Sequence, residues 1–194
     1  MNKLEIIKIA NENNGYIYSE LIKKYDIPTA YLTQLVKEGL LSRVARGIYI
    51  TSQGVEDQLF IYSLTYHKMI YTGETALFLN NLSKKQIVNY EATMPYGTNI
   101  PKINGVKIRQ SRKKTLLLGV TEVQTSFGNC VKTYDKERCI CDLFKQNDYD
   151  YESVIYAINK YKDNYLNIKK LYGYAKELKV YEKVRNVFEV IGWN

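Results

Sequence analysis

The side chains best suited to chemistry with another molecule lie on one face of the segment from Ala30 to Glu38. Leu32, Leu35 and Val36 recur at helical spacing and predict an apolar face that packs inward. The opposite face then carries Tyr31, Thr33, Gln34 and Lys37. Glutamine can pair with adenine, threonine can meet several base edges or a thymine methyl group, and lysine can meet guanine or phosphate. The pattern is therefore typical of a helix that reads bases in the major groove of DNA.

The residues before and after this segment predict how it is positioned. Ser19 can cap a first helix that ends near Tyr25, because its hydroxyl can accept a hydrogen bond from an N–H group one turn on. Pro28 disfavours helical geometry in the residue before it, so a turn follows. Thr29 can then cap the second helix, and Gly39 suits the left-handed residue that ends it. This order of helix, tight turn and helix predicts a helix-turn-helix.

A two-stranded ribbon is predicted directly after the helix pair, with strands at 41–44 and 48–51. Gly47 supplies the positive φ that a tight hairpin needs. Arg43 and Arg46 lie on this ribbon, where the wing of a winged helix would meet phosphate or the minor groove. These two arginines are therefore candidate anchors on the DNA backbone.

A further helix over residues 3–13 would complete the three helices and wing of a winged-helix domain. The candidate DNA-binding residues of this domain are Ser19, Thr29, Tyr31, Thr33, Gln34, Lys37, Arg43 and Arg46. The alternative is that the helix pair and hairpin serve packing only, because short motifs of this kind also occur in proteins that bind no DNA.

The charge of the chain suits a nucleic-acid partner. The 194 residues carry a formal net charge of +8, although an excess of lysine can also serve solubility alone. No acidic residue lies between Glu91 and Glu122, a stretch that holds six cations. The candidate phosphate contacts within it are Lys107, Arg109, Arg112, Lys113 and Lys114. Such a run can bind phosphate backbones through counterion release, or it can be a solvated face.

The chain is predicted to be an α+β protein with two domains. Residues 1–54 would form the winged helix-turn-helix domain, and residues 55–194 a domain of antiparallel sheet with a helical bundle and a basic surface. The strands of the second domain are expected at 86–94, 105–111, 119–127 and 130–134. Its helices are expected at 55–67, 75–80, 136–145, 151–161, 166–178 and 180–191.

The sequence has no positive sign of an enzyme. His67 is the single histidine and cannot build a nucleophile–histidine–acid array, and a Gly-x-Ser-x-Gly elbow is absent. Cys130, Cys139 and Cys141 do not supply the four ligands of a zinc site, so we expect buried structural thiols, and neither a metal nor a cofactor.

Four carboxylates near element ends could in principle serve a nuclease: Glu74, Asp135, Glu137 and Asp142. Asp135 is better explained as a helix cap, and Arg138 can pair with Asp142 one turn on. A DNA-targeted nuclease or modification enzyme remains the alternative function, and it would depend on Glu74 or Asp142.

The chain shows no sign of a membrane or export segment. It has no run of 18 or more apolar residues, and its first residues lack the apolar core of a signal peptide. We therefore expect a cytoplasmic protein without a membrane partner.

Several short blocks together resemble the AbiEi family of antitoxins, from type IV toxin–antitoxin systems of the abortive-infection (phage defence) type. The blocks are Tyr18–Leu21, Gly39–Tyr49, Thr72–Leu77, Tyr134–Arg138 and Asp142–Leu143. The helix–wing block from Gly39 to Tyr49 is the most specific, and similar blocks recur in other winged-helix repressors.

The resemblance implies a winged-helix domain that represses its own operon by binding inverted repeats in double-stranded promoter DNA. It also implies a C-terminal domain that neutralises a nucleotidyltransferase-type toxin without a stable complex. No motif with a defined chemical role can be carried over for antitoxicity. An antitoxin that binds its toxin directly is therefore a further alternative.

Overall fold

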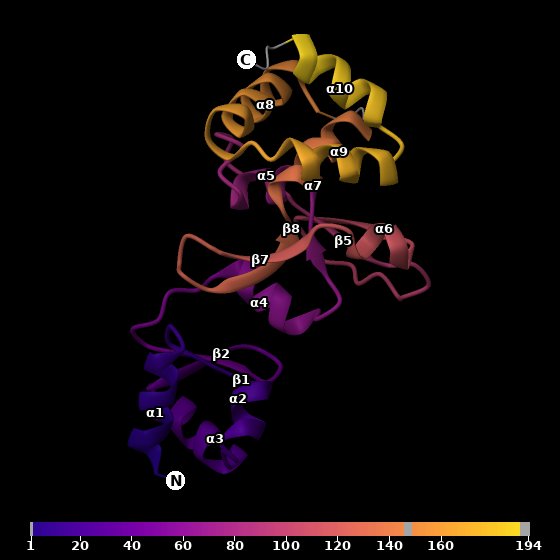
Figure 1. Cartoon of the computed structure of the whole chain (residues 1–194). Helices are drawn as coiled ribbons and strands as arrows, with labels where there is room; N and C mark the ends of the chain where they lie inside the picture. The colour runs from indigo at the N-terminus through magenta and orange to yellow at the C-terminus, as the bar shows by residue number, and fades with distance from the viewer. Residues whose placement is uncertain (1, 146–148, 191–194) are drawn as a thin grey trace. The chain divides into compact units, whose positions relative to one another are not determined.

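The computed structural model describes residues 2–145 and 149–190 and shows an α+β protein with two sheets (Figure 1). The chain divides into two compact units. The first unit holds residues 1–67 and 124–131, and the second holds residues 68–123 and 132–194. The first unit therefore extends past Gly54 to His67. The cause is helix α4 (Gln58–Thr65), whose Ile61 is buried with Tyr16, Ile48 and Ile50 of the first unit.

The first unit is built from three helices and a small sheet ahead of α4. In chain order these are α1 (Lys3–Glu12), β1 (Tyr16–Tyr18), α2 (Ser19–Lys24), α3 (Thr29–Lys37), β2 (Leu41–Ala45) and β3 (Ile48–Thr51). The sheet has the order β1-β3-β2, and both of its pairs are antiparallel. Strand β1 was not expected, because three residues are too short a run to show an alternating pattern.

The helix ends follow local chemistry. Asn2 and Glu5 form a capping box at the start of α1. Gly39, at φ 72°, ends α3, and the Leu40 N–H donates to the Leu35 carbonyl at 3.0 Å, which is the bonding of a Schellman motif. The predicted caps at Ser19 and Thr29 are wrong, because both are already the first residue of a helix.

Ser19 and Thr29 are not caps because the residue before each of them has the extended backbone of an N-cap. Tyr18 pairs with Ile48 in the sheet and stands at the N-cap of α2, while Pro28, with φ −65° and ψ 128°, stands at the N-cap of α3. Neither position has a side-chain capping bond. The apolar side chains of α1, α2 and α3 meet in one core with Leu41 of β2.

The second unit begins with a mixed sheet. Its elements up to the last strand are β4 (Ile70–Tyr71), α5 (Gly73–Leu79), β5 (Tyr90–Pro95), β6 (Val106–Ser111), α6 (Lys113–Leu117), β7 (Val120–Gln124) and β8 (Cys130–Tyr134). The strand order is β6-β5-β4-β8-β7. Strand β4 pairs antiparallel with β5, but β4–β8 and β5–β6 are parallel.

The expected antiparallel sheet is therefore wrong. Strand β4 is only two residues long, so it gave no strand pattern, yet it lies in the centre of the sheet. The chain between β5 and β6 returns to the start of β5 before β6 begins, which makes that pair parallel. Residues 124–131, at the tip of the hairpin between β7 and β8, group with the first unit.

Four helices complete the second unit: α7 (Lys136–Lys145), α8 (Tyr151–Tyr165), α9 (Ile168–Glu177) and α10 (Tyr181–Val190). They share one core with Leu77 of α5, Leu116 of α6 and Tyr134 of β8. The expected helical bundle is thus present, and α7 runs through its centre, with seven buried residues. No helix within the described ranges is long and apolar enough to cross a membrane.

Candidate functional site

The outward face of α3 carries three of the four polar side chains expected there. Thr33, Gln34 and Lys37 are exposed, whereas Leu32 and Leu35 on the other face are fully buried. Tyr31 is only half exposed, because its ring packs against the core of the first unit. The expectation that Tyr31 lies outside is therefore only partly correct, and the exposed polar set reduces to three residues.

The hairpin after α3 presents both predicted arginines to solvent. Arg43 and Arg46 are exposed, and a bulge interrupts the pairing of β2 with β3 between Arg43 and Ala45. The Arg43 Nε donates to the Ala45 carbonyl at 3.3 Å. Gly47 has φ 72°, as the tight turn requires, and a Cβ there would lie 2.8 Å from the Ser19 hydroxyl. The turn thus touches the start of α2.

All eight predicted DNA-binding residues therefore lie in one compact unit. Ser19 and Thr29 are exposed at the first positions of α2 and α3. The helices and the hairpin are held together by a shared core that includes Leu32, Leu35 and Leu41. A rigid core beneath exposed polar side chains is the arrangement that a surface for recognition needs.

The basic run in the second unit is split over two elements. Lys107 and Arg109 lie on β6, Arg112 precedes α6, and Lys113 and Lys114 begin α6, a helix that was not expected. Arg109 is half-buried, while the other four side chains are exposed.

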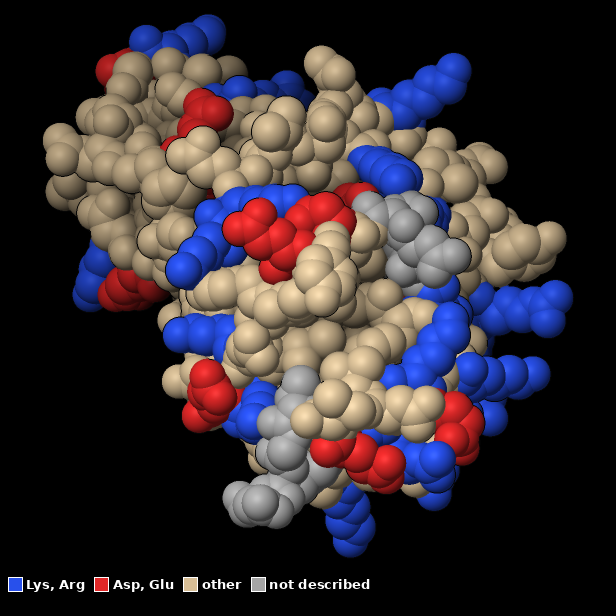
Figure 2. Space-filling model, turned by 90° about the horizontal axis from the view of Figure 1, so that it is seen from above, with Lys and Arg blue, Asp and Glu red and all other residues tan. Residues whose placement is uncertain are grey.

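Two of these cations meet carboxylates from distant parts of the sequence. The Lys107 ammonium lies 3.8 Å from Glu91, and the Lys114 ammonium lies 2.8 Å from Glu177. Figure 2 shows the same mixing of acidic and basic side chains on the face seen from above Figure 1. The absence of acidic residues along the run therefore does not make a uniformly basic face.

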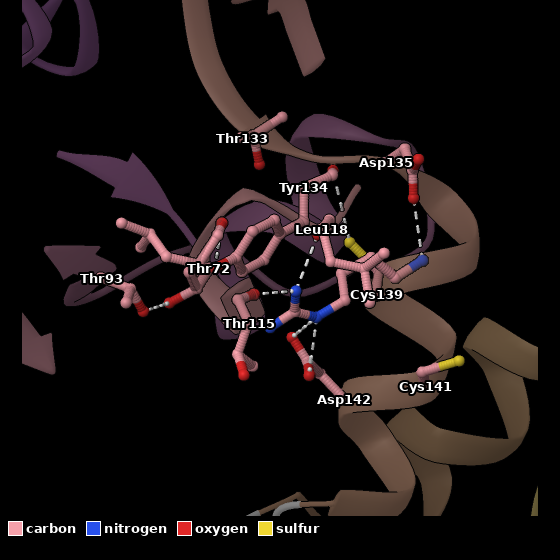
Figure 3. A network of polar contacts seen from close by, with 12 residues as sticks. Thr72, Thr93, Thr115, Leu118, Thr133, Tyr134, Asp135, Cys139, Cys141 and Asp142 are labelled. Carbon is pink, nitrogen blue, oxygen red and sulfur yellow. Dashed lines mark hydrogen bonds and ion pairs between the residues drawn. The ribbon is translucent and has the colours of Figure 1, made fainter. Parts of the chain in front are cut away.

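A buried polar network lies inside the second unit. Arg138 and Asp142 of α7 are 3% and 4% exposed, and the Arg138 Nε donates to both Asp142 oxygens at 3.1 Å (Figure 3). The Arg138 Nη1 donates to the carbonyls of Thr115 and Leu118, each at 2.7 Å. Its guanidinium stacks 3.9 Å from the ring centre of Tyr134. The predicted pair of Arg138 and Asp142 is confirmed, and it also ties α6 to α7.

Burial dominates the protonation chemistry of this network. Burial raises the pKa of Asp142, although the Arg138 guanidinium acts in the opposite direction. Burial also raises the pKa of Tyr134 to about 12, and its hydroxyl donates to the Leu116 carbonyl. The Asp142 carboxylate is thus a structural partner of Arg138.

The other carboxylates named for an enzyme also have structural partners. Asp135 accepts from the Arg138 N–H at 2.9 Å, which confirms it as the cap of α7. Lys170 reaches both Asp135 and Glu137 at 3.0 Å. Glu74 is half-buried on α5, where burial raises its pKa. Within the described ranges, no group of three or more His, Cys, Asp or Glu side chains could hold a metal ion.

Close packing explains why the Thr72–Leu77 block has a glycine at position 73. Gly73 has φ 60°, and a Cβ there would lie 1.6 Å from an oxygen of Glu91. The Thr75 hydroxyl accepts from the Glu91 N–H at 2.8 Å. Gly73 therefore lets the start of α5 pack directly against β5.

The three cysteines differ in their surroundings. Cys139 and Cys141 are buried, and burial raises the pKa of Cys141 to about 12 and that of Cys139 well above its usual range. Cys130 is exposed, so the expectation of a buried thiol is wrong at this position. It lies at the start of β8, where alternate side chains face outward.

Two features were not foreseen from the sequence. A polar cavity of about 230 Å³ opens in the second unit. It is lined by Thr72, Thr93, Arg109, Gln110, Ser111, Tyr134, Arg138, Asp142 and Lys145. Three of the short sequence blocks compared with the AbiEi family contribute to this lining: Thr72–Leu77, Tyr134–Arg138 and Asp142–Leu143. The residues come from β5, β6, β8, α7 and the position between β4 and α5, so only the fold brings them together.

The second unforeseen feature is a buried carboxylate in the first unit. Asp57 is 1% exposed and accepts hydrogen bonds from the Phe60 N–H at 3.2 Å, the Thr125 hydroxyl at 2.5 Å and the Asn129 amide at 2.9 Å. Its own N–H donates to the Tyr16 hydroxyl at 2.7 Å. Asp57 therefore holds residues 124–131 to the start of α4. The aspartate three residues before Phe60 is a capping signal that the sequence does contain.

Comparison with known proteins does not indicate a function for this chain. No protein-family model and no curated protein matches the chain. Among solved structures, the chain is similar to the RV2827C protein from Mycobacterium tuberculosis, with a TM-score of 0.48 and 9% sequence identity. The similarity covers 88% of this chain and 73% of that one. A likeness at this level determines neither the fold nor the function of this chain.

Proposed function

We propose that the chain is an antitoxin of the AbiEi kind that also represses its own promoter, with the first unit as a winged-helix DNA-binding domain. The observation that carries the proposal is the exposed set of Thr33, Gln34 and Lys37 on α3, a helix whose other face is buried. These side chain types suit base edges in the major groove. Exposed Arg43 and Arg46 on the following hairpin suit phosphate or the minor groove.

The order of elements in the first unit supports the same proposal. Three helices are followed by a hairpin of β2 and β3, which is the helix and wing order expected from the sequence. The proposal gives α3 the role of reading bases and gives the hairpin the role of positioning the domain on the backbone. In this scheme inverted repeats in the promoter are bound by two copies of the chain.

The experiment is binding of the purified chain to its own upstream promoter DNA and to a scrambled duplex, measured over a salt series. Specific binding that weakens with salt supports the proposal. Arg43→Ala with Arg46→Ala should weaken binding to both duplexes, because phosphate contacts carry no sequence information. Lys8→Ala is the matched control, since Lys8 is an exposed cation on α1 outside the proposed surface. No binding to either duplex at low salt would refute a DNA-binding function.

The role of the second unit rests on the resemblance to the AbiEi family. The proposal is that this unit neutralises a nucleotidyltransferase-type toxin without forming a stable complex. Co-expression of the chain with the adjacent toxin should restore growth, and affinity purification of one protein should not bring the other along. Rescue together with co-purification would favour direct binding of the toxin. Failure to rescue would remove the antitoxin function.

A further inference from the structure

We propose that the cavity in the second unit is a binding site for a single phosphate group, either as inorganic phosphate or as part of a small phosphorylated molecule. The site is lined by side chains of β5, β6 and α7 together with Thr72 after β4 and Tyr134 of β8. It is distinct from the proposed DNA-binding surface, which lies in the first unit.

The first argument is the state of the buried guanidinium. Arg138 is 3% exposed and lines the cavity. Its Nε is bonded to Asp142, and its Nη1 is bonded to the carbonyls of Thr115 and Leu118. Its Nη2 donates to no acceptor in the described ranges. The Arg138 Nη2 is not among the fully buried side-chain atoms that lack a partner, so it is accessible from the cavity and can donate to an acceptor that enters there.

The second argument is the charge of the lining. Arg109, Arg138 and Lys145 contribute three cationic side chains, and Asp142 contributes one carboxylate. The carboxylate, which pairs with Arg138, offsets one of these three charges, so the lining residues keep a surplus of two positive charges. Surplus positive charge around a cavity favours an anion. Arginine and lysine are also the side chains that commonly bind phosphate.

The third argument is the set of hydroxyl groups. Thr72, Thr93 and Ser111 all line the cavity. Figure 3 shows Thr72 and Thr93 side by side, with their hydroxyl oxygens joined by a contact of 3.4 Å. A contact of that length is weak, so either hydroxyl can turn its proton to a ligand. The Tyr134 hydroxyl is already engaged by the Leu116 carbonyl and is not needed as a donor. Several short donors around one space suit the tetrahedral oxygens of a phosphate.

The size of the cavity limits the ligand. Its volume of about 230 Å³ is smaller than the roughly 300–1,000 Å³ of pockets that hold drug-sized molecules. A phosphate with a small attached group fits such a space. The backbone of a DNA duplex is a poor fit, because the donor on Arg138 is almost completely buried.

The test is calorimetric titration of the full chain with inorganic phosphate, with a nucleoside monophosphate and with chloride at matched ionic strength. We expect one saturable site for phosphate or the monophosphate and none for chloride. Tighter binding of the monophosphate would identify a phosphorylated molecule as the ligand, and equal binding would identify phosphate itself. No saturable binding of either compound up to about 10 mM would overturn the proposal, since that limit corresponds to a very weak interaction.

Two variants localise the site without removing the buried pair. Lys145→Gln removes a charged group and should weaken phosphate binding by about tenfold. Ser111→Ala removes a hydroxyl group and should weaken phosphate binding by less. Lys169→Gln is the matched control, because Lys169 is an exposed lysine on α9 that does not line the cavity. Equal phosphate affinity in Lys145→Gln and Lys169→Gln would also reject this site. DNA binding by Lys145→Gln is measured in parallel and should not change.

Discussion

The exposed face of α3 and the buried network of α7 carry similar kinds of side chain in opposite situations. Gln34 and Lys37 are exposed, and in the described ranges their side chains make no hydrogen bond or ion pair. Arg138 and Asp142 are almost fully buried and bind each other. A side chain without an internal partner can be replaced at little cost to folding, so any functional role that it has depends on an external partner. For Arg138 and Asp142, the contribution of the buried pair to stability is enough to account for both side chain types.

The largest effect is expected on breaking the buried pair. Arg138→Ala should lower the free energy of unfolding by about 3–5 kcal/mol, because it leaves the Asp142 carboxylate buried without its cation. Urea denaturation followed by circular dichroism measures this. Lys114→Ala is the control, since Lys114 forms an exposed ion pair with Glu177 in the same unit and its loss should leave the midpoint in place. Similar midpoints for both variants would contradict the structural role of Arg138.

A smaller loss is expected from the buried carboxylate of the first unit. Asp57→Ala should lower the free energy of unfolding by about 1–3 kcal/mol, because three donors lose their acceptor and α4 loses its cap. Thermal unfolding measures the loss, and limited proteolysis should cut within residues 124–131 more readily. The neighbouring Glu56→Ala provides the control, as Glu56 is exposed. Equal protease resistance in the two variants would show that Asp57 does not hold the hairpin tip.

These two networks also show how far the sequence alone could lead. The pair of Arg138 and Asp142 was predictable because residues four apart share a helix face, and Asp135 was predictable as a cap. The bonds of Asp57 to Thr125 and Asn129 were not predictable, because they join residues about 70 positions apart. Long-range contacts of this kind leave no periodic trace in the sequence.

The same distinction applies to the elements and to the candidate sites. The long helices followed from apolar spacing, whereas β1 and β4 were missed because two or three residues carry no pattern. Those two short strands in turn account for the wrong cap at Ser19 and the wrong sheet type. The outward face of α3 followed from the same spacing, except at Tyr31. The cavity could not be foreseen, since four separate elements and Thr72 contribute to it.

The α3 face should behave in the opposite way to the buried networks. Gln34→Ala should leave the free energy of unfolding unchanged, because Gln34 is exposed. If α3 reads bases as proposed, the variant should also reduce discrimination at one base pair by about 1–3 kcal/mol, the value of one bidentate contact to a base edge. Competition binding with single-base variants of the promoter duplex measures this. Gln58→Ala, an exposed glutamine on α4, is the matched control. Unchanged sequence preference in Gln34→Ala would remove Gln34 from base reading.

The smallest effect is expected on the salt dependence of DNA binding. It compares two neighbouring lysines of α6, of which, among the described residues, Lys113 is an unpaired cation and Lys114 a paired one. In the described ranges Lys113 has no ion pair, whereas Lys114 lies 2.8 Å from Glu177. If the basic run contacts phosphate, Lys113→Gln should reduce the slope of log K against log salt concentration by about 0.9, the contribution of one neutralised phosphate. Lys114→Gln should change the slope less, because its ammonium must first leave Glu177. Equal slopes for both variants and the unmodified chain would show that this run faces solvent, and the salt dependence would then belong to the first unit alone.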